Sequence, residues 1–294
     1  MSRSKEWIVF AVIAALVIAT SYLTGGTAGT VPGSEGNIKI AHNNWAENIA
    51  VSHLWKQLLE EKGYRVQLIQ TEKAPVWAGV ADGSVDMLTE AWLPHTDKPY
   101  YKKYKKQIEL HDAWYEGTGL GLVVPEYMEN IDTIEDLKQN EDQFIRNGEP
   151  SIVGIDAGAS LMRLSEKAIK EYRLDYNLIE SSEPAMLSEL DKAYKNKKPL
   201  VVTLWNPHWA FKKYDLKYLK DDKKVYGEGD TIYYATRNGF KNDHPEIVRW
   251  MDRWKMDDDS LGELILAIEE SDPEKGTIKW IEENRDLVDQ WLQE

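Results

Sequence analysis

The chain of 294 residues contains no cysteine. Disulfide bridges, thiolate catalysis, cysteine-ligated zinc and iron–sulfur clusters are therefore excluded. Basic residues are also in short supply: 36 lysines and arginines stand against 50 aspartates and glutamates, which gives a formal net charge of −14. A chain this acidic lacks the basic surface that phosphate contacts need, so no nucleic acid partner is expected.

Phenylalanine is scarce, with 4 residues, whereas tryptophan occurs 12 times. Tryptophan is a large, amphipathic side chain that is usually used sparingly. Core packing accounts for most tryptophans in any protein. The excess nevertheless indicates that some indole rings here have a role beyond filling a core.

Residues 1–36 form a segment of their own. Arg3 and Lys5 precede an apolar run over 7–23, and a stretch with 5 glycines in 13 residues follows over 24–36. This order is typical of a signal peptide or signal anchor, and the run is close to the shortest length that spans a bilayer. We expect an N-terminal hydrophobic helix that is either cleaved or tethers the chain to the membrane, with the folded part outside the cytoplasm. The absence of a clear Ala-x-Ala site favours the anchor, and the absence of cysteine excludes a Cys-linked lipoprotein.

Strand and helix patterns alternate over the rest of the chain, which predicts α/β lobes built on mostly parallel sheets. Strands are expected at 37–43, 64–71, 85–92, 118–128, 151–157, 176–182, 199–205 and 231–239. Helices are expected at 47–63, 75–84, 133–140, 159–173, 184–198, 244–255, 258–270 and 272–294, and a basic surface helix or turn is expected at 100–107. We assign 37–125 and 225–294 to a first lobe and 126–224 to a second. In such a hinged architecture, ligands bind in the crevice between the lobes, at the carboxyl ends of the strands.

Three tryptophans lie at or just after the carboxyl ends of predicted strands. Trp45 follows the first strand, Trp92 ends the third, and Trp205 ends the strand at 199–205. Indole faces attract cations by about 0.5–2 kcal/mol each, and a quaternary ammonium suits them because its methyl groups need no hydrogen bonds. The three residues predict an aromatic cage, although packing between the lobes would also explain any one of them.

The second and third of these tryptophans belong to a repeated Trp-x-Pro-His sequence, with His95 and His208 as the last residues. Proline stiffens the turn after the strand, and the histidines can donate a hydrogen bond to an acidic group. With His42 they are also conceivable metal ligands, but no metal-ligand spacing is present and no metal site is predicted.

The stretch GIDAGAS, residues 154–160, leads into a predicted helix. Small residues allow a ligand to approach the backbone, and the N–H groups at a helix N-terminus bind anions. We assign the amides of Ser160 and Leu161 as candidate donors to a carboxylate. A plain structural turn explains the same residues, and no nucleotide-binding pattern is present. Cage and helix terminus together match a small zwitterion, an N-methylated amino acid. No catalytic constellation stands out, so binding rather than catalysis is expected, with no cofactor.

The sequence resembles the glycine betaine/proline betaine-binding proteins of ABC importers, the OpuAC family. The resemblance extends from about Asn37 to the C-terminus and is carried by AHNNWAENIA, the stretch from EKGYRV to TEAWLP, KYKKQIE, GLGLVVPEYM, IEDLK, VGIDAGAS, VVTLWNPHWAFKKYDLKYL and ATRNGF. It implies a type II periplasmic-binding-protein fold that closes on its ligand, a cage of Trp45, Trp92 and Trp205, and carboxylate binding by the amides of Ser160 and Leu161. It also implies an ABC permease and its ATPase as partners and a role in osmoprotection.

The sequence departs from the family pattern at one position. Family members often carry histidine five residues after the second cage tryptophan, as a further carboxylate ligand; Asp97 stands there in this chain. An ionised Asp97 would repel a carboxylate, so we expect it to point away. Either His95 takes over the role of the family histidine, or the chain binds the carboxylate without a histidine. Binding of choline, carnitine or ectoine, or a membrane-tethered sensory module with the same fold, are the alternative functions.

Overall fold

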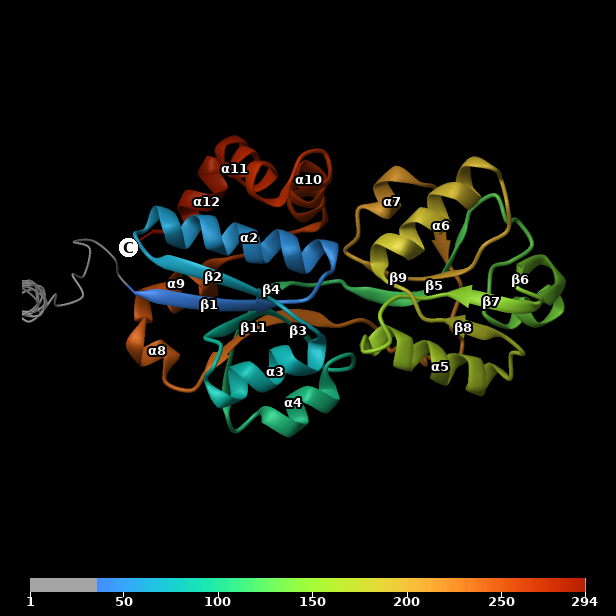
Figure 1. The fold of residues 1–294 in the computed structure, drawn as a ribbon, viewed down its shortest axis with the longest axis horizontal. Coiled ribbons are helices and arrows are strands. Elements are labelled where there is room, and N and C mark those ends of the chain that lie inside the picture. Colours follow the sequence, from blue (N-terminus) through green and yellow to red (C-terminus); the bar gives the residue numbers. More distant parts are fainter. Residues whose placement is uncertain (1–35, 294) are drawn as a thin grey trace, which may run out of the picture.

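A computed structural model of the chain describes residues 36–293. The predicted N-terminal hydrophobic helix lies outside these residues. Within them, no helix combines the length and apolar character needed to cross a bilayer. Two α/β lobes lie side by side, each built around one sheet (Figure 1).

The first sheet has the strand order β2-β1-β3-β11-β4. Its strands are β1 (Asn37–His42), β2 (Arg65–Gln70), β3 (Met87–Leu93), β4 (Ile108–Tyr115) and β11 (Thr231–Arg237). β1 pairs in parallel with β2 and β3, whereas β11 runs antiparallel to β3 and β4. All residues of β3 are buried, because helices cover both faces of the sheet.

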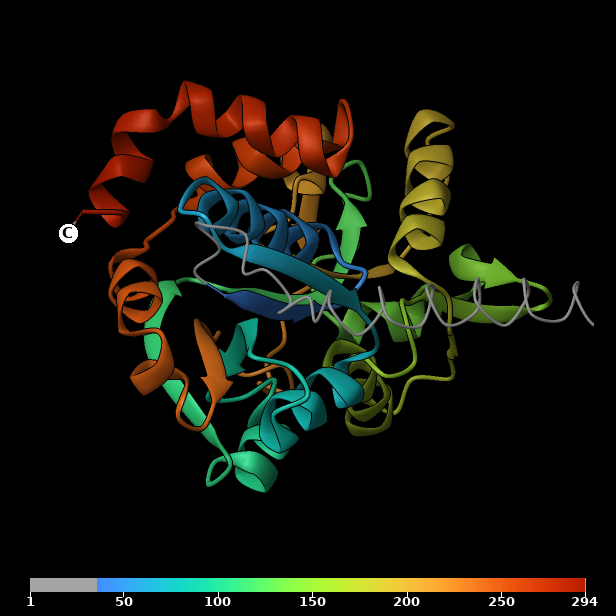
Figure 2. The same ribbon diagram turned by 60° about the vertical axis from the view of Figure 1, so that its left-hand side comes forward.

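One face of this sheet carries α2 (Ala46–Glu61), and the other carries α3 (Lys73–Asp82) and α4 (Lys98–Tyr104) (Figure 1). The helices α2 and α3 each end before a glycine with positive φ, Gly63 at 92° and Gly83 at 78°, a conformation that a side chain would strain. The C-terminal helices α10 (Asp258–Glu269), α11 (Pro273–Glu283) and α12 (Arg285–Trp291), drawn in red in Figure 2, pass over the outside of α2. Two shorter helices, α8 (Phe240–Asp243) and α9 (Pro245–Arg253), connect β11 to them.

The second sheet has the strand order β10-β5-β9-β7-β6, with β8 paired to β7. Its strands are β5 (Gly119–Pro125), β6 (Ile145–Arg146), β7 (Glu149–Val153), β8 (Asn177–Ile179), β9 (Val202–Asn206) and β10 (Leu216–Tyr218). α5 (Ser160–Tyr172) lies on one side of the sheet, and α6 (Glu183–Lys195) and α7 (Ala210–Lys213) lie on the other (Figure 1).

The prediction of an α/β two-lobed fold is confirmed, but the sheets are mixed and not mostly parallel, because β11 pairs antiparallel with β3 and β4, and β5 pairs antiparallel with β9 and β10. β5, which we placed in the first lobe, pairs with β9 and β10 in the second sheet, so the chain crosses over at 116–118 rather than at 125. β4, β6 and β10 were not predicted. The helix expected at 133–140 is a short 3₁₀ helix, η1 (Glu135–Gln139), and a second 3₁₀ helix that was not predicted, η2 (Glu141–Phe144), follows it.

Candidate functional site

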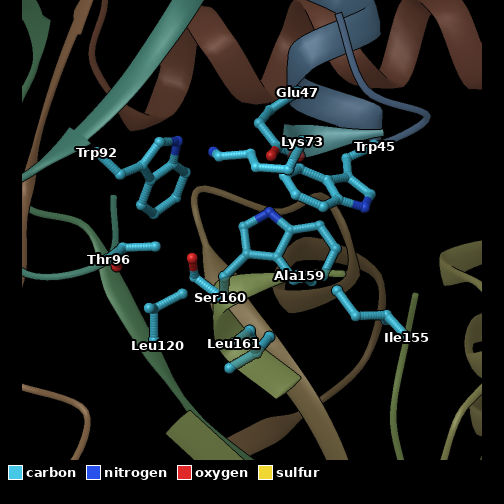
Figure 3. A pocket seen from close by; sticks show the side chains of 11 residues that line it. Trp45, Glu47, Lys73, Trp92, Thr96, Leu120, Ile155, Ala159, Ser160 and Leu161 are labelled. Carbon is cyan, nitrogen blue, oxygen red and sulfur yellow. The ribbon is translucent and has the colours of Figure 1, made fainter. Parts of the chain in front are cut away.

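A pocket lies between the two lobes, in front of the N-terminus of α5 (Figure 3). The first lobe contributes Trp45, Glu47, Lys73, Trp92 and Thr96 to its wall, and the second contributes Leu120, Ile155, Ala159, Ser160, Leu161 and Trp205. The structure therefore brings together five of the six residues that the sequence assigned to the site.

The three tryptophans come from different elements and meet at this pocket. Trp45 precedes α2, Trp92 lies near the end of β3 and Trp205 near the end of β9. The ring centroids of Trp45 and Trp205, from opposite lobes, are 6.4 Å apart, and the ring planes are inclined by 58°. Trp92 and Trp205 are 4% and 3% exposed, and Trp45 is half-buried. The arrangement offers indole faces from both lobes to one small space.

Two of the indole N–H groups are held by carboxylates outside the pocket. Trp45 Nε1 donates to Asp156 Oδ2 of the second lobe over 3.2 Å, and Trp92 Nε1 donates to Glu90 Oε2 over 3.3 Å. The Trp92 bond lies within one lobe and fixes that ring before a ligand arrives, which lowers the entropy cost of binding, whereas the Trp45 bond joins the two lobes and belongs to the closed arrangement.

The N-terminus of α5 faces the pocket through Ser160 and Leu161. The backbone N–H groups of these two residues have no acceptor within residues 36–293, as expected for the first turn of a helix. Gly154, directly after β7, allows α5 to pack close to the end of that strand, because a Cβ atom at this position would lie 2.3 Å from the sulfur of Met162 in α5. Two free donors at the positive end of a helix dipole form an anion site.

His95 does not reach the pocket. Its side chain is exposed and lies against Gly227, while its backbone N–H donates to Asp230 over 2.6 Å. Thr96 lines the wall instead. Both Trp-x-Pro-His sequences contain a cis peptide bond before proline, Leu93–Pro94 and Asn206–Pro207.

Asp97 points away from the pocket, as expected, but it has a structural role that the sequence did not reveal. It is fully buried, its Oδ2 accepts the backbone N–H of Trp92 over 2.9 Å, and it forms an ion pair with Lys73 Nζ at 2.8 Å. Burial raises the pKa of Asp97, against the opposing effect of Lys73. The pair fixes the turn that follows the second cage tryptophan.

A protein-family model, the OpuAC substrate binding domain of ABC-type glycine betaine transport systems, matches residues 36–283. The chain belongs to this family. Members of the OpuAC family are substrate-binding proteins of transporters and not enzymes, and the substrate-binding proteins of ABC importers act outside the cytoplasm.

Two solved OpuAC-type structures resemble the chain over most of its length. Lactococcal OpuAC, in its closed conformation with glycine betaine, is 33% identical, with a TM-score of 0.80 over 88% of this chain and 100% of its own. The glycine betaine/L-proline-binding protein ProX from Borrelia burgdorferi is 32% identical, with a TM-score of 0.82 over 88% and 97%. The glycine betaine/carnitine transport binding protein GbuC of Listeria monocytogenes is 43% identical over 145 residues. That alignment spans 48% of each chain, about half the length of GbuC.

Sequence reasoning missed two charged residues of the OpuAC pocket, Glu47 and Lys73. Glu47 is 1% exposed and Lys73 is 4% exposed. Lys73 Nζ lies 5.2 Å from the ring centroid of Trp45 and is the single basic group in the described pocket wall. Both residues lie in the first turn of a helix, where charged residues are common, so the sequence alone did not distinguish them from ordinary surface residues.

The pocket acid belongs to a larger group of buried carboxyls. Burial, followed by the negative charge of Glu183, raises the pKa of Glu47 to about 8. Burial and the charge of Glu47 likewise raise the pKa of Glu90 well above its ordinary value. Burial raises the pKa of Glu183 to about 8. One lysine, Lys73, cannot neutralise all of these acids, since it is paired with a further one, Asp97.

Glu183 also connects the two lobes. Its Oε2 accepts the backbone N–H of Ala46, the first residue of α2 in the other lobe, over 3.0 Å. Its Oε1 lies 3.0 Å from His208 Nε2. Burial lowers the pKa of His208 to about 3, so its ring is neutral. Because its Nδ1 accepts the backbone N–H of Ala210, the ring proton lies on Nε2, which donates to Glu183. His208 thus supports the interlobe contact from behind Trp205. Within residues 36–293, no group of three metal-ligating side chains is present.

Proposed function

We propose that the chain captures glycine betaine in this pocket and delivers it to an ABC permease. One observation carries the proposal. Indole rings from both lobes and the free N–H groups of Ser160 and Leu161 line the same small space. We assign the trimethylammonium group of the ligand to the side of the pocket lined by Trp45, Trp92 and Trp205, and its carboxylate to the side lined by the N-terminus of α5.

The energies are of the size that capture requires. Micromolar binding needs about 8 kcal/mol. Three cation–π contacts contribute about 0.5–2 kcal/mol each, and charge-assisted hydrogen bonds to the carboxylate contribute about 1.5–3 kcal/mol each. The cage is assembled only when the lobes approach each other, so the ligand favours the closed arrangement through contacts that the open one lacks.

The family and two relatives support this ligand and these partners. Lactococcal OpuAC was crystallised with glycine betaine, and both the name of GbuC and the description of the family refer to glycine betaine. The apolar segment 7–23 fits a tether to the membrane or a cleaved signal, with the permease and its ATPase as partners in the same membrane. The name of GbuC also covers carnitine, which carries the same trimethylammonium and carboxylate groups on a longer chain.

Calorimetric titration of the full-length chain with glycine betaine, proline betaine, carnitine, choline and ectoine tests the proposal. We expect the tightest binding for glycine betaine. Choline should bind at least about tenfold more weakly, because it leaves the N–H groups of α5 without an anion. Tight binding of ectoine without binding of glycine betaine would contradict the proposal. A response only to choline would show that the α5 site does not hold a carboxylate.

A further inference from the structure

We propose that Glu47 is the counter-ion of the ligand's ammonium group, and that it gives up a proton to solvent when the ligand enters the cage. This inference rests on the proposed function, since it needs a cation between the tryptophans. Glu47 is neither one of the cage tryptophans nor a donor to the ligand carboxylate, so this is a separate role in the pocket.

Glu47 lies in the wall of the pocket and is nevertheless buried. Its side chain lines the pocket beside Trp45 and Lys73 (Figure 3), yet it is 1% exposed. Its Oε2 atom has no hydrogen-bond partner among the described residues. The indole N–H of Trp205 is near enough to favour the ionised carboxyl but falls short of hydrogen-bond geometry, and Trp205 Nε1 is likewise unpartnered. A buried carboxyl oxygen with no protein donor, in the wall of a cation site, lies where the positive charge of a bound quaternary ammonium would stabilise its ionised form, although that cation has no N–H to donate.

Most of the titratable groups around Glu47 are acidic. Glu183 faces it from α6, Lys73 from α3 and Glu90 from β3. Glu90 is in turn faced by Asp97, and Glu183 by His208, Asp156 and Glu269. The nearest cation, Lys73, is occupied by Asp97. The surroundings of Glu47 are thus dry and mainly negative, which favours its neutral form while the cage is empty.

The exchange balances in charge and atoms. In the empty pocket the carboxyl of Glu47 carries a proton. When a permanent cation occupies the cage, the ionised carboxylate is stabilised, the O–H bond breaks, and the proton leaves for the solvent. The net change is one cation gained and one proton lost. Because the pKa of Glu47 in the empty protein is about 8 and falls when the cation binds, ligand binding strengthens as the pH rises toward 8 and becomes constant above it.

Calorimetry in several buffers measures the proton directly. The full-length chain is titrated with glycine betaine at pH 7 in phosphate, PIPES and HEPES, whose ionisation enthalpies differ. The slope of observed enthalpy against buffer enthalpy gives the protons released per ligand. We expect a release approaching one proton, and an affinity that increases between pH 6 and pH 8 by up to about tenfold per pH unit.

Two variants locate the proton. Glu47→Gln keeps the size of the side chain but has no proton to release in this range, so the buffer dependence should fall toward zero and the affinity should no longer change between pH 6 and pH 8. Glu149→Gln, an exposed residue of β7, is the matched control and should behave as the wild type. Glu47→Gln that still releases the proton would overturn the assignment.

The wild-type measurement alone also decides the question. Clear binding of glycine betaine with heats that do not depend on the buffer would overturn this inference and leave the cage intact. No binding of glycine betaine in any buffer would overturn the proposed function, and this inference with it.

Discussion

The backbone N–H of Ala46, at the start of α2 in the first lobe, donates to the carboxylate of Glu183, at the start of α6 in the second lobe, over 3.0 Å. This hydrogen bond crosses the crevice directly behind the cage and exists only while the lobes are closed. It makes closure, and not the tryptophans alone, part of the binding free energy.

Glu183→Gln should therefore weaken binding of glycine betaine by about tenfold or more. The amide can accept from Ala46 or from His208 but not from both, and leaving the other buried donor without an acceptor costs about 1–3 kcal/mol. Calorimetric titration of the variant beside Glu149→Gln measures the effect. Equal affinity of the two variants would show that the interlobe hydrogen bond does not stabilise the bound state.

His95→Ala should leave the affinity for glycine betaine within about twofold of the wild type. The side chain of His95 is exposed and does not line the pocket, so it does not touch a ligand bound there. The same titration provides the measurement. A tenfold weaker affinity would return His95 to the role of carboxylate ligand that the sequence suggested.

The buried acids predict how stability depends on pH. Glu47 and Glu183 have folded-state pKa values of about 8, above their unfolded values, so the folded state binds more protons and stability falls as the pH rises through this range. Each of the two groups lowers the free energy of unfolding by roughly 1 kcal/mol as the pH rises from 7 to 8.5. Histidines with lowered pKa, such as His53 at about 4, act in the opposite direction but only below about pH 7.

Thermal denaturation of the ligand-free chain from pH 7 to pH 8.5 should thus show a falling melting temperature, and Glu47→Gln should reduce the fall. A melting temperature that is constant or increases over this range would contradict the raised pKa values.

Lys73→Met should destabilise the chain by about 3 kcal/mol or more, because it leaves the fully buried Asp97 without its cation. Adding Asp97→Asn should recover part of the stability, since asparagine still accepts the N–H of Trp92 without carrying a charge. Urea denaturation of the single and double variants measures both effects, with the exposed Lys98→Met as control. A single variant as stable as the control would show that the ion pair is dispensable.

The sequence predicted the parts of the site that depend on strand ends. Trp45, Trp92 and Trp205 stand where strands finish, and the carboxyl ends of strands line the crevice in this architecture. The turn before Ser160 also follows the end of a strand, and its run of small residues between a strand and a helix could be recognised in the sequence. The two-lobed fold followed from the alternation of strands and helices.

What the sequence did not reveal depends on contacts between distant segments. Glu47 and Lys73 look like ordinary charged residues in the first turn of a helix, and only the folded chain shows that both are buried. β4 was missed because charged residues interrupt its apolar pattern. β5 was assigned to the wrong lobe because a turn residue such as Gly117 does not show which sheet the next strand joins. His95 and Asp97 are two positions apart, and their opposite orientations are set by Asp230 and Lys73 from other elements.

The central claim is that indole rings from opposite lobes enclose one quaternary ammonium group. Its most direct test is the affinity for glycine betaine of Trp205→Ala, measured by calorimetry beside Trp250→Ala, a tryptophan of α9 outside the pocket. We predict that Trp205→Ala binds at least about tenfold more weakly than the wild type, while Trp250→Ala binds as the wild type does. Wild-type affinity in a folded Trp205→Ala variant would contradict the account.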